Sequence, residues 1–72
     1  MCIVALKSNT YAQKAKKILF KQGIKAEILR LEPYKTKNGC SYGVSFPCES
    51  QFHVEFYLKQ SNINYSEILR EQ

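Results

Sequence analysis

Residues 2–24 read CIVALKSNTYAQKAKKILFKQGI, and this stretch contains the pattern that decides the fold. Residues 2–7 form a nearly unbroken apolar run, which is typical of a central strand buried on both faces. Residues 8–10 (Ser-Asn-Thr) are candidate N-caps, and over residues 11–22 the apolar side chains recur with the helical period of 3.6. Gly23 is the expected left-handed stop. The stretch therefore predicts a strand followed directly by an amphipathic helix.

The rest of the chain continues the alternation of strand and helix patterns. It predicts, in order, a strand over 25–32, a polar and basic loop over 33–40, a strand over 41–46, a helix over 48–60 and a short strand over 64–69. The order βαββαβ in 72 residues predicts one α+β domain, residues 1–72, with the ferredoxin-like split βαβ fold. Right-handed crossovers then give an antiparallel sheet of strand order 4-1-3-2 with both helices on one face.

Composition excludes several classes of protein. No apolar run approaches the ~20 residues of a membrane span, and the short apolar start has no signal-peptide cleavage pattern, so we expect a cytoplasmic protein with no membrane partner. The net charge of +5 attracts anions without naming them. Three cysteines without a CxxC pair or a histidine cluster argue against a disulfide framework and a structural zinc site. We expect neither a metal nor a cofactor.

Cys40 is the candidate functional residue. It ends the flexible 33–40 loop, and the predicted topology places it at the same pole as the N-terminus of the first helix. The partial positive charge of that terminus and nearby lysines favour the nucleophilic thiolate. The residues expected to support the thiol are Lys7, Ser8, Asn9, Thr10, Lys35, Lys37, Gly39 and Ser41.

The pattern of the third strand allows a different interpretation of the same residue. Counted by twos, Cys40 falls on the same face of the strand as Tyr42, Val44 and Phe46, which is the apolar face. Its sulfur can therefore equally be a small apolar plug that fills space in the core. The Asn-Gly pair before it favours a turn, which would break the parity. Both alternatives stay open at this point.

The other two cysteines are expected at the opposite pole. Six strand residues separate Cys40 from Cys48, roughly 20 Å at ~3.3 Å per residue, which excludes a bond between them within one chain. Cys2 begins the first strand and is expected in the core, and Cys48 is expected to have a structural or neutral role.

The sequence resembles a small bacterial family of selenium/sulfur carrier-like proteins over nearly its whole length. The residues that carry the resemblance are Ser8, Ala12, Ala15, Leu19, Gly23, Ile24, Pro33, Gly39-Cys40, Val44, Phe46-Pro47 and Ile63. The most specific element is the lone cysteine at the start of the third strand, seven residues after Pro33. The family usually has glycine after this cysteine, where this chain has Ser41. Its second helix usually has an acidic surface, where this chain has Phe52, His53 and Phe56.

The resemblance implies a carrier that uses Cys40 as the acceptor of sulfur or selenium. A donor such as a cysteine desulfurase would transfer the atom to the Cys40 thiolate, giving a persulfide for delivery to an acceptor protein. The residues themselves suggest no catalytic constellation. His53 is the sole histidine and is expected far from Cys40, so we expect a carrier or binding protein and not an enzyme.

Two other functions are compatible with the sequence. RNA-recognition domains share the βαββαβ order, and residues 42–46 partly match RNP1, one of their sequence motifs. However, Tyr42, Val44 and Phe46 share the face expected in the core, which leaves no aromatic platform for stacking bases. A thiol-independent protein-interaction module is the stronger alternative.

The pattern of the predicted helix over 48–60 also indicates an interaction surface. Val54, Tyr57 and Leu58 best continue the core pattern, so Phe52 and Phe56 should point to solvent. Phe20 lies off the apolar stripe of the first helix and is expected close to them. The three aromatics would then form an exposed patch for a homodimer or a partner protein. The alternative is a rolled helix that places Phe52 and Phe56 in the core, which aromatic burial would favour.

Overall fold

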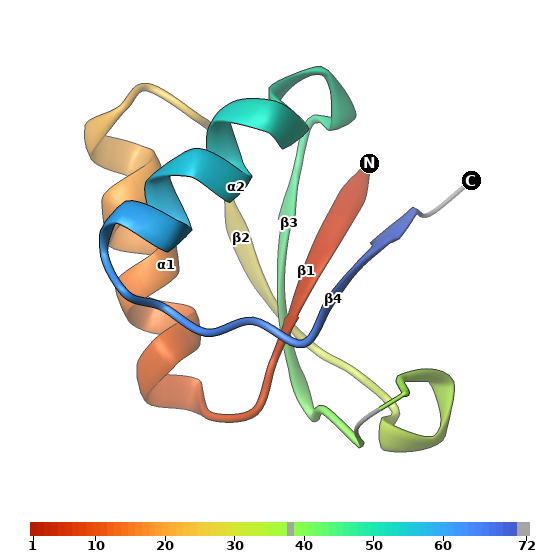
Figure 1. The fold of residues 1–72 in the computed structure, drawn as a ribbon. Helices are drawn as coiled ribbons and strands as arrows, with labels where there is room; N and C mark the ends of the chain where they lie inside the picture. The colour runs from red at the N-terminus through yellow and green to blue at the C-terminus, as the bar shows by residue number, and fades with distance from the viewer. Residues whose placement is uncertain (38, 71–72) are drawn as a thin grey trace.

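The computed structural model describes residues 1–37 and 39–70 (Figure 1). Its elements follow the predicted order, with two short 3₁₀ turns added. They are β1 (Cys2–Leu6), α1 (Asn9–Lys21), β2 (Glu27–Arg30), η1 (Pro33–Lys35), β3 (Tyr42–Phe46), η2 (Cys48–Ser50), α2 (Gln51–Gln60) and β4 (Glu67–Arg70). The two edge strands are shorter than the predicted 25–32 and 64–69, and the first turn of the second predicted helix is η2.

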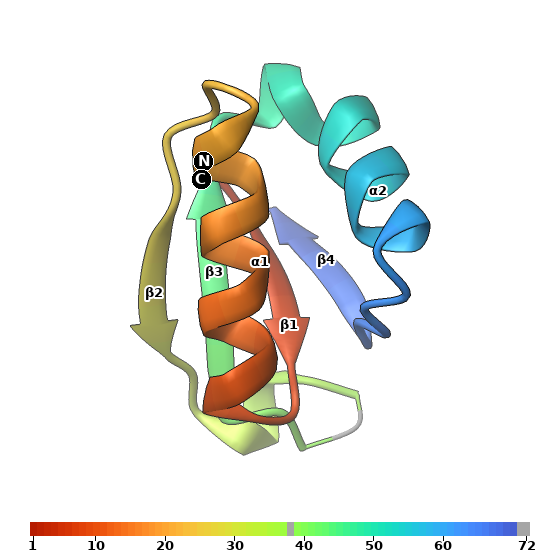
Figure 2. The same ribbon diagram turned by 90° about the vertical axis from the view of Figure 1, so that its left-hand side faces the viewer.

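The four strands form one antiparallel sheet of order β2-β3-β1-β4. Read from the other edge, its hydrogen-bonded neighbours are the pairs 4-1, 1-3 and 3-2. Both helices cover the same face, and the other face is not covered by a helix (Figures 1 and 2). Two layers therefore enclose the core.

Local sequence explains both ends of α1. Ser8 is the N-cap among the three candidates, since its hydroxyl oxygen accepts a hydrogen bond from the backbone nitrogen of Tyr11 at 3.2 Å. Gly23 has φ +75°, and the next residue, Ile24, donates its backbone hydrogen bond to the carbonyl of Leu19 at 2.9 Å. This is the predicted left-handed termination, which glycine adopts without a steric penalty. Asn62 ends α2 in the same conformation, with φ 58°.

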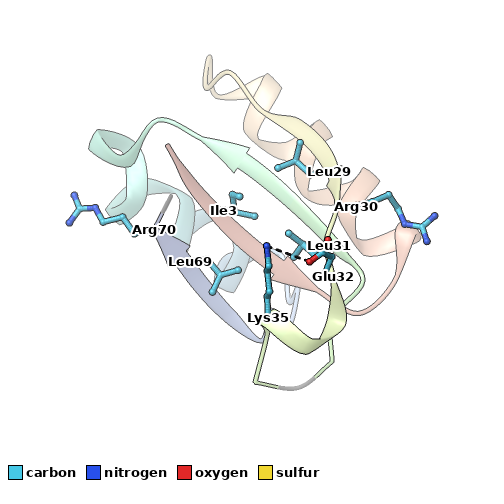
Figure 3. A pocket seen from close by; sticks show the side chains of 8 residues that line it. All are labelled: Ile3, Leu29, Arg30, Leu31, Glu32, Lys35, Leu69 and Arg70. Atoms are coloured by element: carbon cyan, nitrogen blue, oxygen red, sulfur yellow. Dashed lines mark ion pairs between the residues drawn. The ribbon is translucent and has the colours of Figure 1, made fainter. Parts of the chain in front are cut away.

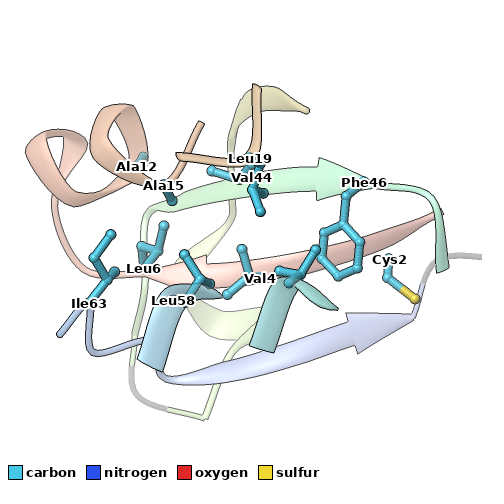
Figure 4. Packing of buried hydrophobic residues seen from close by; sticks show 11 residues of the cluster. Cys2, Val4, Leu6, Ala12, Ala15, Leu19, Val44, Phe46, Leu58 and Ile63 are labelled. Atoms are coloured by element: carbon cyan, nitrogen blue, oxygen red, sulfur yellow. The ribbon is translucent and has the colours of Figure 1, made fainter. Parts of the chain in front are cut away.

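The core lies between the helices and the sheet. Its members alternate along β1 and β3 and follow the helical period in α1 and α2 (Figure 4). They are Cys2, Val4, Leu6, Ala12, Ala15, Leu19, Val44, Phe46, Val54, Leu58 and Ile63. The predicted stripe of α2 is confirmed for Val54 and Leu58, which are fully buried. Burying a side chain of this size stabilises the fold by about 1.5–3 kcal/mol.

The uncovered sheet face is also partly packed. An ideal Cβ built on Gly43 would lie 2.6 Å from Cγ2 of Ile3 and 3.0 Å from Cδ1 of Leu31. Gly43 thus lets two larger side chains close over the middle of β3, and Ile3 is buried as a result. The two edge strands of this face, β2 and β4, have the same sequence, Glu-Ile-Leu-Arg.

Cys2 and Cys48 form a disulfide, with their Cα atoms 5.0 Å apart. The expectation of no disulfide was wrong, and the reason lies in the register. Cys2 is paired with Phe46 across β1 and β3, so the chain needs only Pro47 to bring Cys48 back over Cys2. Their shared pole was predicted, but their pairing was not.

None of the helices among residues 1–37 and 39–70 is long and apolar enough to cross a membrane. In the same residues, no group of three or more potential ligands from His, Cys, Asp and Glu is placed to hold a metal ion.

Candidate thiol site at Cys40

Cys40 is a free cysteine with 0% of its surface exposed. It lies in the connection between β2 and β3, at the pole where α1 begins (Figures 1 and 2). It is not a member of the core cluster beneath the helices, although it shares strand parity with that cluster's Val44 and Phe46. The thiol is therefore buried, as the plug alternative proposed, but outside the main core.

Two hydrogen bonds close the loop around Cys40. At its base, the backbone nitrogen of Leu31 donates to the carbonyl of Ser41 at 2.8 Å. Within it, the backbone nitrogen of Cys40 donates to Oγ1 of Thr36 at 2.6 Å, and Thr36 is itself buried. Gly39 has φ +66°, a left-handed turn that glycine adopts readily.

A third bond ties the loop to the far edge of the sheet. The backbone nitrogen of Lys37 donates to Oε1 of Glu67 at 3.0 Å. Because Glu67 begins β4 and the loop leaves from β2, the connection reaches from one edge strand to the other. The loop lies on the side of the sheet away from the helices (Figure 1). We call residues 31–37 and 39–41, with these three bonds, the Cys40 loop.

The predicted cationic surroundings are only partly present. Nζ of Lys35 lies 3.4 Å from a carboxylate oxygen of Glu32, so its charge is partly balanced. The hydroxyl of Tyr34 donates to the same Glu32 oxygen, and this bond, followed by the contact with Lys35, lowers the pKa of Glu32 below its usual value. Lys7 lines a different groove, with Tyr11 and residues 64–66.

The other predicted supporting residues have structural or surface positions. Ser8 caps α1, while Asn9 and Thr10 are exposed in its first turn. The side chain of Lys37 is exposed, and its backbone rather than its charge holds the loop. Ser41 is half-buried and closes the loop through its carbonyl. Of the predicted residues, four therefore lie in the Cys40 loop, namely Lys35, Lys37, Gly39 and Ser41. Lys7, Ser8, Asn9 and Thr10 lie outside it.

A shallow cavity of about 520 Å³ lies on the uncovered sheet face (Figure 3). Its lining is aliphatic and charged: Ile3, Leu29, Arg30, Leu31, Glu32, Lys35, Leu69 and Arg70. None of these residues is aromatic.

The exposed phenylalanines form two separate surfaces. Phe52 is 79% exposed and Phe56 is 56% exposed, as predicted, and they line one groove with Glu55 and Lys59. Phe20 is 78% exposed, but it lines another groove together with Ile28 of β2. The prediction that Phe20 lies beside Phe52 and Phe56 was wrong, since Phe20 faces the β2 side of α1. We call Phe52 and Phe56 the α2 aromatic pair.

Sequence reasoning missed two residues that hold the site. The sequence gives only a weak indication for Thr36. It is a hydroxyl residue four positions before Cys40, and such side chains often accept hydrogen bonds from backbone nitrogens in loops. Glu67 has no local signal, because it lies 30 residues from Lys37 and meets it only through the fold.

Comparison with known proteins adds one finding. A family model described as "Putative Se/S carrier protein-like" matches residues 1–70. No curated protein and no solved structure matches the chain. Because the family model spans both helices, all four strands and the Cys40 loop, the chain belongs to the selenium/sulfur carrier-like family.

Proposed function

We propose that this protein carries a sulfur or selenium atom on Cys40, in the cytoplasm, on a fold that we infer to be ferredoxin-like. One observation supports it most directly. In a chain of a carrier-like family, Cys40 is the one free thiol among the described residues, since Cys2 and Cys48 are bonded to each other.

The transfer needs only thiolate exchange. The Cys40 thiolate attacks the outer sulfur of a donor persulfide, R–S–SH, and a new S–S bond forms as the old one breaks. The donor leaves as the thiol R–SH, and Cys40 becomes Cys40–S–SH, with no net oxidation. A donor that carries selenium in the outer position would react in the same way. Delivery is the same exchange with an acceptor thiol as the attacking group.

A buried sulfur can exchange only if the Cys40 loop opens. Opening breaks the bonds of Cys40 to Thr36, Lys37 to Glu67 and Leu31 to Ser41. A hydrogen bond of this kind contributes about 1 kcal/mol net, so the cost of opening is within reach of thermal fluctuation or of a docking donor. Closure would afterwards shield the persulfide from other thiols.

The test is loading by a desulfurase with free cysteine, followed by mass spectrometry of the intact protein and its peptides. Loading adds the mass of one sulfur atom to the peptide that contains Cys40, and Cys40→Ser abolishes it. A sulfur atom found on Cys48 instead, or no loading at all, contradicts the proposal.

The two Glu-Ile-Leu-Arg strands provide a matched pair of variants. Glu67→Ala removes the contact with Lys37, and we expect loading to become about fivefold faster, the equivalent of one hydrogen bond. Glu27→Ala changes the same position of the other edge strand and should leave the loading rate unchanged.

The burial of Cys40 also favours a second candidate, a thiol-independent interaction module. In that case the α2 aromatic pair is the surface that binds the partner protein, and Cys40 only fills space inside its loop. A Cys40→Ala variant that keeps full partner binding, together with a wild type that cannot be loaded, would support it.

A further inference from the structure

The two cysteines of the Cys2–Cys48 disulfide are unequally exposed. Cys2 is 1% exposed, and Oε1 of Gln51 lies 3.9 Å from its Sγ. Cys48 is only partly buried, at the start of η2 and directly before α2. An attacking thiolate must approach one sulfur along the line of the S–S bond, so access decides which sulfur reacts. Of the two residues Cys48 has the larger exposed surface, so it is the better candidate for attack by a thiol from solvent.

We propose that Cys48 is a thiol-exchange site, and that its substrates are low-molecular-weight thiols of the glutathione class. This inference does not depend on the proposed function of Cys40. The two sites lie at opposite ends of β3, whose 5 residues span about 17 Å at ~3.3 Å per residue.

The reaction balances in two steps. A thiolate RS⁻ attacks Sγ of Cys48, the Cys2–Cys48 bond breaks, and the products are Cys48–S–S–R and the Cys2 thiolate, which takes up a proton. A second RS⁻ then attacks the sulfur of R, which gives R–S–S–R and the Cys48 thiolate. The two electrons that reduce the disulfide come from the two small thiols. Reversal by R–S–S–R restores the disulfide.

The test uses the matched variants Cys2→Ser and Cys48→Ser, each treated with oxidised glutathione under native conditions. Mass spectrometry of peptides follows the mixed disulfide at the remaining cysteine of the pair. We expect Cys48 in Cys2→Ser to react at least about tenfold faster than Cys2 in Cys48→Ser, because Cys48 is the more exposed of the two residues. In urea both variants should react at the same rate, which controls for intrinsic reactivity.

A second measurement on the wild type covers the case in which a variant does not fold. The native protein is reduced with glutathione, and the mixed disulfide is trapped by rapid acidification and mapped. Glutathione found on Cys48 supports the proposal. Equal reaction of the two cysteines, trapping on Cys2, or a disulfide that glutathione reduces only after unfolding would overturn it.

Discussion

Oγ1 of Thr36 lies 2.6 Å from the backbone nitrogen of Cys40 and accepts its hydrogen bond. Both residues are buried, so this contact links the backbone of the cysteine to the loop that covers it. Removal of the acceptor should therefore change how often the thiol meets solvent, without a change at the sulfur itself.

The first prediction follows from this contact. Thr36→Val keeps the shape of the side chain but leaves the N–H of Cys40 without its acceptor, at a cost of about 1 kcal/mol to the closed loop. We expect alkylation of Cys40 by iodoacetamide in the native protein to become about fivefold faster. Thr10→Val, at an exposed position of α1, is the control and should have no effect. An unchanged rate in Thr36→Val would show that this bond does not limit access to Cys40.

The disulfide should account for a large part of the stability. It closes a chain segment of sequence separation 46, so its reduction should lower the free energy of unfolding by about 2–4 kcal/mol. Urea unfolding with and without a phosphine reductant measures the difference. The same loss is expected in a Cys40→Ser background, because Cys40 takes no part in the bond. A loss below the error of extrapolation would mean that the unfolded state gains little freedom on reduction.

Gly43→Ala should destabilise the sheet by about 1–3 kcal/mol, because the new methyl group overlaps Cγ2 of Ile3. Ile3→Leu removes that branch methyl group, so the double variant should recover part of the loss. Thermal unfolding of the wild type, the two single variants and the double variant gives the coupling energy. Strict additivity of the two substitutions would argue against a direct clash.

The α2 aromatic pair is expected to mediate self-association. Phe52→Ser/Phe56→Ser should convert a dimer to a folded monomer, since both side chains are exposed and their loss leaves no cavity in the core. Sedimentation of both proteins measures the change. Phe20→Ser is a matched control of similar exposure in a separate groove, and it should leave the dimer intact. A monomeric wild type would refute this prediction.

Tyr65 gives a prediction for alkaline pH. Burial, and then the negative charge of Glu55, raise the pKa of Tyr65 above its usual value of 10.0, and its hydroxyl donates to Glu55 Oε1 at 3.4 Å. The unfolded chain therefore ionises first, so this stabilising contribution is complete below about pH 10 and is lost as pH rises through the folded pKa. Tyr65→Phe should flatten the decline in stability between about pH 9 and 11. Identical pH profiles in urea unfolding would contradict it.

The elements of the fold were predictable because their signals are local. Ser8 and Gly23 limit α1 through bonds to residues three to five positions away, and such spacings are visible in a sequence. The alternation along β1 and β3 likewise marks the faces of a sheet without knowledge of its partners. The split of α2 into buried and exposed faces follows from the same kind of periodicity.

The unpredicted features all depend on residues far apart in the chain. The disulfide needs the register that pairs Cys2 with Phe46, and no local pattern contains that register. The loop that contains Cys40 is tied to β4 by the bond between Lys37 and Glu67, 30 residues apart. The position of Phe20 relative to the α2 aromatic pair was not predictable. Helical periodicity gives the direction of a side chain around its own helix, but not which neighbouring element it faces.

Under the proposed carrier function, the bond between Lys37 and Glu67 would couple the loaded state of Cys40 to the edge strand β4. A thiol with no exposed surface would accept a second atom only after part of its loop moves, which would weaken the contact with β4. By thermodynamic linkage, whatever loosens β4 must in turn favour loading to the same degree. An acceptor that recognises a frayed Glu-Ile-Leu-Arg edge would then distinguish the charged carrier from the empty one without touching the sulfur.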